Sequence, residues 1–126
     1  MYESFFGLSE EPFRLTPDPR YLYLSKRHLE ALTALHYGVE RRRGFIEITG
    51  EVGAGKTTLC RTFVSQLKPT VKSAMIFNPA LSGAQMLKTI LQDFGIQGAH
   101  RTKKDCFDAI NNFLLEENSH GNNVIL

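Results

Sequence analysis

The chain has little net charge and few cysteines, and each shortage limits its possible roles. Fifteen Lys and Arg face 13 Asp and Glu among 126 residues, which gives a formal net charge of +2. Counterion release on nucleic acid needs many cations clustered on one face, so nucleic acid is disfavoured as a partner without being excluded. Cys60 and Cys106 lack both the spacing of metal ligands and the number needed for a disulfide framework. A reduced, cytoplasmic setting is therefore expected.

The sequence also lacks the long apolar runs of exported and membrane-spanning chains. Its first residues, MYESFFGLSEE, carry acids where a signal peptide has a basic start and an apolar stretch. No run approaches the roughly 18 apolar residues of a membrane span. With 42% hydrophobic residues in 126, the chain can bury one ordinary core. This composition predicts a soluble single domain or part of one.

Residues 1–24 are rich in proline and in aromatic side chains. Pro12, Pro17 and Pro19 are expected to prevent a regular helix and to favour an extended segment. The aromatic residues of this segment are Phe5, Phe6, Phe13, Tyr21 and Tyr23. So many rings in a short stretch indicate that the segment lies against another surface.

A helix is predicted over residues 25–44. Ser25 is a suitable N-cap, Gly44 is a suitable stop, and apolar side chains recur between them at helical spacing. The run from Arg41 to Arg43 has two interpretations. It could contact nucleic acid, but cations in the last turn of a helix also complement the helix dipole. The second, structural interpretation is favoured.

Strands and helices alternate after this helix. The expected elements, in chain order, are a buried strand at 45–49, a helix from Lys56 that ends by Pro69, a strand at 72–78, a helix that begins with the Ser82–Gln85 capping box, a helix at 104–118 and a third strand from Asn123. This alternation predicts an α/β fold, with helices flanking a parallel sheet through right-handed crossovers.

The stretch GEVGAGKTT lies between the first expected strand and the helix that follows it, and it fits the Walker A phosphate-binding pattern. Its residues are Gly50, Glu51, Val52, Gly53, Ala54, Gly55, Lys56, Thr57 and Thr58. Glycines allow the backbone to turn so that successive N–H groups face phosphate oxygens, and the helix N-terminus adds partial positive charge. A glycine-rich turn that binds nothing is the alternative, and it is disfavoured because the strand and helix are in the expected places.

Three side chains of this stretch have distinct expected roles. Lys56 is the catalytic candidate, because its ammonium can reach the β and γ phosphates of a bound ligand. Thr57 is the expected ligand of Mg²⁺ through its hydroxyl, and Thr58 is expected to contact the α phosphate. These residues therefore predict a ligand with β and γ phosphates, bound together with Mg²⁺.

Other chemistry-bearing residues have structural interpretations. Cys60 could be a redox switch, but it shares an apolar helix face with Phe63 and is expected in the core. Glu47 is unusual in a central strand and is expected to form an ion pair, with a functional contact as the alternative. The four histidines show no spacing to Asp or Ser that supports nucleophilic catalysis.

The chain resembles the AAA+ ATPase domain of the general secretion pathway protein A family. The resemblance is carried by MYESFFGLSEEPFRLTPDPRYLYLS, by GFIEITGEVGAGKTTLCR and by FNPALSG, and it extends over essentially the whole chain. It implies a P-loop NTPase fold, ATP or ADP as ligand, and a homo-oligomer. It also implies that Pro12 and Phe13 lie against the adenine. Residues 1–24 would then form an adenine-side platform, and residues 25–126 the amino-terminal half of the nucleotide-binding domain.

The family resemblance implies that the ATPase powers assembly of a bacterial secretion or pilus complex. The domain would lie on the cytoplasmic side of the inner membrane, to which the intact protein would be anchored by regions outside this sequence. The alternative is a nucleotide-dependent adaptor ATPase of a DNA transposition complex, because the family is similar to transposition ATPases. An apolar span of about 20 residues after this region would favour the envelope role.

By the same resemblance, the strand that starts at Asn123 should lead into the Walker B acids. The sequence stops before them, so the chain by itself is expected to lack ATP hydrolysis. The sheet is likewise expected to be incomplete, because strands after the third are absent. The gap could close by direct pairing of the strand at 45–49 with the third strand, or another copy of the chain could fill it.

Overall fold

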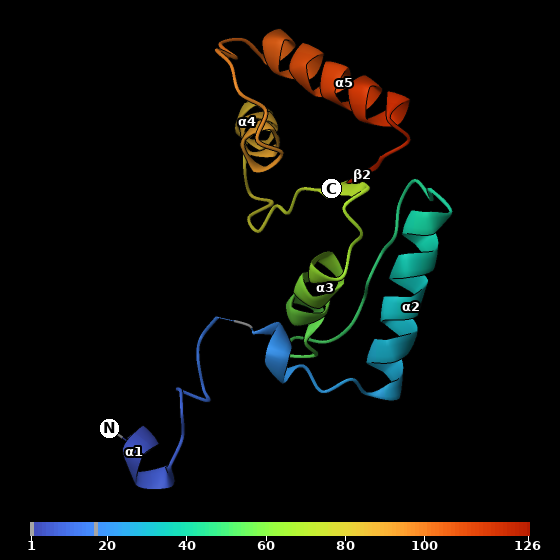
Figure 1. The fold of residues 1–126 in the computed structure, drawn as a ribbon. Coiled ribbons are helices and arrows are strands. Elements are labelled where there is room, and N and C mark those ends of the chain that lie inside the picture. The colour runs from blue at the N-terminus through green and yellow to red at the C-terminus, as the bar shows by residue number, and fades with distance from the viewer. Residues whose placement is uncertain (1, 17) are drawn as a thin grey trace. The chain divides into compact units, whose positions relative to one another are not determined.

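The computed structural model describes residues 2–16 and 18–126. The chain divides into two compact units, Met1–Gln66 and Leu67–Leu126. Helices predominate in both, and two short strands occur in the second unit (Figure 1). The expectation for Pro17 lies outside the described residues.

The amino-terminal segment of the first unit contains two short helical pieces. The α-helix α1 spans Tyr2–Phe6, and the 3₁₀ helix η1 spans Pro19–Tyr21. The expectation that proline would prevent a regular helix here was wrong for α1, because that helix ends before the first proline of the segment. In η1, proline occupies the first position, where its missing N–H costs no helical hydrogen bond. The Asp18 side chain caps this turn by accepting from the Arg20 N–H at 3.0 Å.

Helix α2 spans Lys26–Glu40 and begins as predicted. The Ser25 side chain accepts from the His28 N–H, which is the expected N-cap interaction. The helix ends before Gly44, contrary to expectation. Arg42 adopts the left-handed conformation with φ of 50°, and the Arg43 N–H donates to the Gly38 carbonyl at 2.9 Å. This is a Schellman-type end in which arginine occupies the position that glycine usually takes.

The early helix end changes the place of the arginine run. Arg41 is the C-cap, and Arg42 and Arg43 follow the helix rather than occupying its last turn. The predicted interaction of the arginines with the helix dipole therefore applies only at the C-cap, where Arg41 lies. The Arg41 guanidinium lies 5.5 Å from the ring centroid of Tyr37, in a cation–π arrangement.

Helix α3 spans Lys56–Ser65 and packs against α2 to form the core of the first unit (Figure 1). The buried apolar side chains at this contact are Leu32, Leu35, Val39, Leu59 and Phe63. His36 meets Phe63 edge to face, with ring centroids 5.0 Å apart. The helix that was predicted from Lys56 is confirmed, and it ends before Pro69.

The buried strand expected at 45–49 is not formed. The segment has no strand pairing within residues 2–16 and 18–126, and Phe45 is fully exposed. A strand requires a neighbour for its N–H and C=O groups, and the two strands found among the described residues pair with each other instead. Direct pairing of this segment with the strand from Asn123 is therefore not seen. Glu47 is exposed, and the same described residues provide no ion pair for it.

The second unit holds a two-stranded parallel sheet. Strand β1 spans Val71–Ser73 and pairs with β2, Asn123–Ile125, with Val71 opposite Asn123. The prediction of a parallel arrangement is confirmed for this pair, but β1 is shorter than the expected 72–78. After Ser73 the ladder continues only through the Ala74 N–H, which donates to Ile125 O at 3.0 Å. The next amide, Met75 N–H, donates to the Asp93 carboxylate at 2.6 Å.

Helices α4, Gly83–Asp93, and α5, Lys103–Ser119, connect the two strands. The Ser82–Gln85 capping box is confirmed, since each side chain bonds the backbone of the other residue. A second capping box joins Thr102 and Asp105 at the start of α5. The two helices pack together, with the rings of Phe94 and Phe113 5.0 Å apart. Cys106 of α5 is 2% exposed, and Ile90 and Leu91 of α4 are buried as well.

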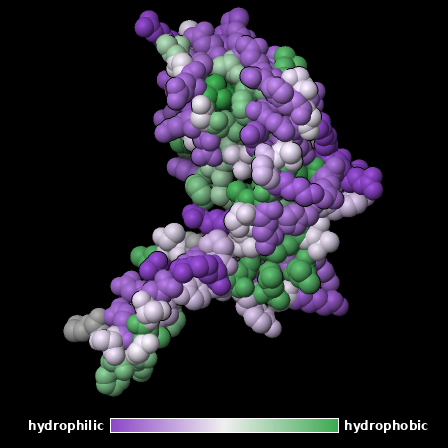
Figure 2. Space-filling view, viewed as in Figure 1, coloured by the Kyte–Doolittle hydropathy of each residue, from purple (hydrophilic) through white to green (hydrophobic). Residues whose placement is uncertain are grey.

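Several apolar side chains of the amino-terminal segment are exposed. Phe5 and Phe6 of α1 lie at the surface, and Figure 2 shows hydrophobic colour where that helix lies in the view of Figure 1. Phe13 is 86% exposed. Across the part of the chain that the structure describes, no helix combines the length and apolarity needed to cross a membrane.

Candidate functional site

The loop from Gly50 to Gly55 leads into α3 through two left-handed residues. Gly53 has φ of 80° and Gly55 has φ of 83°, a conformation that strains residues with a Cβ. The Ala54 N–H donates to the Glu51 carbonyl at 3.2 Å, which closes a turn across the tip. The glycine positions of the motif therefore have the backbone role that the sequence predicted for Gly53 and Gly55. A Cβ on Gly50 would make only ordinary van der Waals contact, 3.6 Å from Ala54 Cβ, so sterics do not demand glycine at this position.

Lys56 folds back over this loop. Its Nζ donates to the carbonyl oxygens of Gly50 and Glu51, each at 2.7 Å. An ammonium has three N–H donors, so these two bonds hold the charge over the loop and leave capacity for one further acceptor. A strong acceptor such as a phosphate oxygen could take that bond.

The first turn of α3 can bind an anion. Its N-cap, Gly55, provides no side-chain cap, so the early N–H groups are not bonded by a capping oxygen. The positive end of the helix dipole lies at the same place. Thr57 is exposed there, and Thr58 is half-buried and lines a cavity beside the loop. Both hydroxyls are thus at the end of the helix where the sequence predicted ligand contacts.

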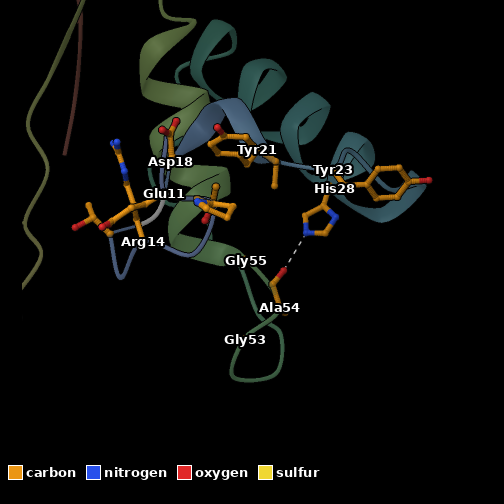
Figure 3. A pocket seen from close by; sticks show the side chains of 13 residues that line it. Glu11, Arg14, Asp18, Tyr21, Tyr23, His28, Gly53, Ala54 and Gly55 are labelled. Atoms are coloured by element: carbon orange, nitrogen blue, oxygen red, sulfur yellow. Dashed lines mark hydrogen bonds between the residues drawn. The ribbon is translucent and has the colours of Figure 1, made fainter. Parts of the chain in front are cut away.

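A cavity of about 410 Å³ lies within the first unit, between the loop and the amino-terminal segment (Figure 3). Its lining residues are Glu11, Pro12, Arg14, Thr16, Asp18, Tyr21, Leu22, Tyr23, His28, Gly53, Ala54, Gly55 and Thr58. The structure therefore places Pro12 beside the phosphate-loop residues. Phe13 does not line the cavity, whereas Tyr21 and Tyr23 do. The loop residues Glu51 and Val52 are exposed outside the cavity lining.

An ionic cluster secures the segment that borders the cavity. The Arg20 guanidinium donates to Asp18 Oδ2 at 2.7 Å and to Glu10 Oε2 at 2.9 Å, and Tyr21 OH donates to Glu10 Oε1 at 2.7 Å. Hydrogen bonds from the Arg20 side chain, with help from its backbone N–H, lower the pKa of Asp18 to about 2. The Tyr21 hydroxyl, followed by Arg20, lowers the pKa of Glu10. Both carboxylates therefore stay ionised to a lower pH than an isolated Asp or Glu.

His28 connects the loop to α2, and no role was predicted for it from the sequence. His28 Nε2 lies 2.9 Å from the Ala54 carbonyl oxygen, as the dashed line in Figure 3 marks. Its Nδ1 lies 2.6 Å from Ser25 Oγ. The only local signal was the Ser25–His28 spacing at a helix N-terminus, and that spacing does not indicate the contact with Ala54. Cys60 of α3 is partly buried, and burial raises its thiol pKa, which agrees with a structural role.

Comparison with known proteins identifies the class to which this site belongs. Residues 39–126 match the family model described as AAA domain, so the chain belongs to the AAA domain family. Such domains are nucleotide-binding ATPases of the P-loop class. The match includes the loop at 50–58 and both strands.

The resemblance to general secretion pathway protein A is also confirmed. The chain is 42% identical over 127 aligned residues to General secretion pathway protein A of Aeromonas hydrophila. The alignment includes all of this chain and 23% of that protein, so the chain spans about a quarter of the length of this relative. No solved structure gives a significant match.

Proposed function

We propose that this chain binds ATP with Mg²⁺ at the loop of residues 50–58, as the nucleotide-binding part of an ATPase that powers secretion or pilus assembly. The observation that carries the proposal is the position of Lys56 over a loop with two left-handed glycines, at the uncapped N-terminus of α3. Backbone donors, a lysine ammonium and a helix dipole together suit a polyphosphate.

The side chains around the loop fit this ligand. Lys56 would meet the β and γ phosphates, and Thr58 the α phosphate. Thr57 supplies a hydroxyl oxygen, the type of donor that Mg²⁺ accepts when phosphate oxygens and water complete its octahedron. A bound Mg²⁺ would neutralise part of the phosphate charge. The protein's part is to hold the triphosphate extended along the loop and to place a fixed cation at its end.

The cavity beside the loop is the proposed place of the adenine. Its lining includes Pro12, Tyr21 and Tyr23 together with the loop residues Gly53 and Gly55. Stacking of a base on an aromatic or apolar side chain would use the rings that the sequence placed in this segment. Phe13 stays a proposed contact, and it would have to turn from its exposed position to reach the base.

The wider role rests on relatedness. General secretion pathway protein A is the printed name of the related protein, and the AAA domain family supports ATPase activity and self-association. We accordingly assign the intact protein to the cytoplasmic side of the inner membrane, as a homo-oligomer that acts with envelope secretion or pilus components. The DNA transposition adaptor is not favoured, since neither the loop geometry nor the relative points to DNA.

Isothermal titration calorimetry on the 126-residue chain tests the proposal. MgATP is expected to bind, and removal of Mg²⁺ with EDTA is expected to weaken binding. Thr57→Ala should make the affinity nearly independent of Mg²⁺, whereas Thr70→Ala, a threonine outside the loop, should behave as the unmodified chain. If MgATP at millimolar concentration gave no binding heat and no shift in thermal midpoint, the proposed function would be wrong.

A further inference from the structure

His28 forms a bridge between the first turn of α2 and the phosphate loop, and the bridge has a defined direction. The Ala54 carbonyl oxygen only accepts, so the Nε2 atom that lies 2.9 Å from it must carry the proton and donate. In the neutral ring Nδ1 is then an acceptor, and the Ser25 hydroxyl at 2.6 Å donates to it. Ser25 Oγ in turn accepts the His28 backbone N–H at 3.3 Å. One helix cap therefore fixes the ring and its tautomer.

The bridge acts on the peptide that joins Ala54 to Gly55. In a planar trans peptide, the carbonyl of one residue and the N–H of the next point in opposite directions. Because His28 holds the Ala54 oxygen on the α2 side, the Gly55 N–H is directed away from His28. Within residues 2–16 and 18–126, this N–H has no protein acceptor. It is adjacent to Lys56, whose ammonium marks the proposed phosphate position.

The imidazole also contacts the loop sterically. A Cβ on Gly55 would lie 3.4 Å from His28 Nε2, so the ring would be in van der Waals contact with any side chain at this position. Gly55 already has a left-handed conformation with φ of 83°. The left-handed turn and the His28 bond restrict the same peptide. A loop held in its binding conformation before the ligand arrives loses less conformational freedom on binding.

From these contacts we propose that His28 is a positioning residue for the phosphate loop, which fixes the Ala54–Gly55 peptide so that the Gly55 N–H faces the triphosphate. The inference rests on the proposed nucleotide function and deepens it. In this proposal His28 acts on phosphate binding, although the His28 ring also lines the cavity proposed for the adenine.

The bridge can be tested first without nucleotide. Long-range ¹H–¹⁵N spectra of the imidazole groups in the full 126-residue chain should show His28 as the Nε2–H tautomer, with an unprotonated Nδ1 at pH 8. Ala54 and Gly55 backbone resonances should shift in His28→Phe and return toward their original positions in His28→Gln. An Nδ1–H tautomer for His28 would overturn the proposed bridge.

The role is tested by the affinities of two ligands, MgATP and inorganic triphosphate with Mg²⁺. His28→Phe fills the ring volume without a donor and should weaken both ligands by about three- to tenfold. His28→Gln carries an amide donor at a similar reach and should restore most of the loss. Thermal midpoints of the two variants, measured without ligand, provide the control for a general loss of structure.

The outcomes separate the possible failures. A loss confined to MgATP would place His28 on the base side and overturn its role toward the phosphates. Equal losses in His28→Phe and His28→Gln, or no loss in either, would also overturn it. If the unmodified chain bound neither ligand, the proposed function itself would be overturned, whereas the imidazole spectra would still establish whether the His28–Ala54 bond exists.

Discussion

The ammonium of Lys56 lies 2.7 Å from the carbonyl oxygen of Gly50, the first residue of the phosphate loop. This contact joins the start of the loop to the first residue of α3 and closes the loop around its own cation. A second bond of the same length, to Glu51 O, orients the ammonium from another side. The position of the charge is thus fixed by the backbone that surrounds it, which gives Lys56 a defined place relative to any anion in the loop.

Lys56→Ala should lower the affinity for MgATP by at least about tenfold, because it removes the full positive charge from the proposed phosphate position. The measurement is isothermal titration calorimetry on the 126-residue chain. Lys26→Ala is the matched control, since Lys26 is an exposed lysine at the start of α2 and does not line the cavity. Unchanged binding in the Lys56 variant would contradict the assignment of the loop as a nucleotide site.

Phe13→Ala should weaken ATP and ADP alike and leave inorganic triphosphate almost unaffected, because stacking acts on the base alone. Leu15→Ala removes another exposed apolar side chain from the same segment and serves as the control. Competition with a fluorescent nucleotide would give the three affinities. If Phe13→Ala changed none of them, the base would depend on the residues that line the cavity in the structure, among them Tyr21.

Arg42→Gly should stabilise the first unit by about 0.5–1 kcal/mol, because glycine adopts the left-handed conformation of this C-cap region without a Cβ clash. Thermal unfolding followed by circular dichroism would detect a rise of several degrees. Arg43→Gly provides the comparison, since Arg43 has no positive φ among the described residues. An equal or larger rise for Arg43→Gly would show that the left-handed conformation is not the cause.

Local sequence signals predicted most of the helices and the loop. The caps at Ser25 and Ser82 and the start of α3 at Lys56 each depend on residues within one helical turn, and each is found in the structure. The C-terminal end of α2 was predicted too late in the chain, because Gly44 was interpreted as the residue that stops the helix. The backbone instead turns at Arg42, three residues after the last buried residue of the helix, Val39.

Long-range relationships were harder to predict. The segment at 45–49 has the composition of a strand, but strand formation depends on a paired neighbour that composition cannot supply. The His28–Ala54 contact joins residues 26 positions apart, and no local pattern indicates it. In contrast, the β1–β2 pair followed from the alternation of strands and helices, which favours parallel pairing.

The ionisation of Asp18 provides a prediction for the cluster that borders the cavity. Arg20 lowers the Asp18 pKa from its ordinary value of 3.8 to about 2. The folded chain therefore favours the carboxylate. The contribution of the ionised Asp18 side chain to the stability of the fold is fully present above pH 3.8 and is lost as the pH falls through about 2. Acidification in that window should weaken the Asp18–Arg20 contact and the cap of η1.

Arg20→Gln should raise the Asp18 pKa toward 3.8, because the charged fork that donates to both carboxylate oxygens is removed. A ¹³C NMR titration of the Asp18 carboxyl carbon measures this directly. Arg27→Gln is the control, because Arg27 has no bond to Asp18 among residues 2–16 and 18–126 and lies on the first turn of α2. An Asp18 midpoint near 3.8 in the unmodified chain would show that the Arg20 contact does not hold in solution. A midpoint near 2 that moves only in the Arg20 variant would establish that this arginine maintains the charge beside the cavity.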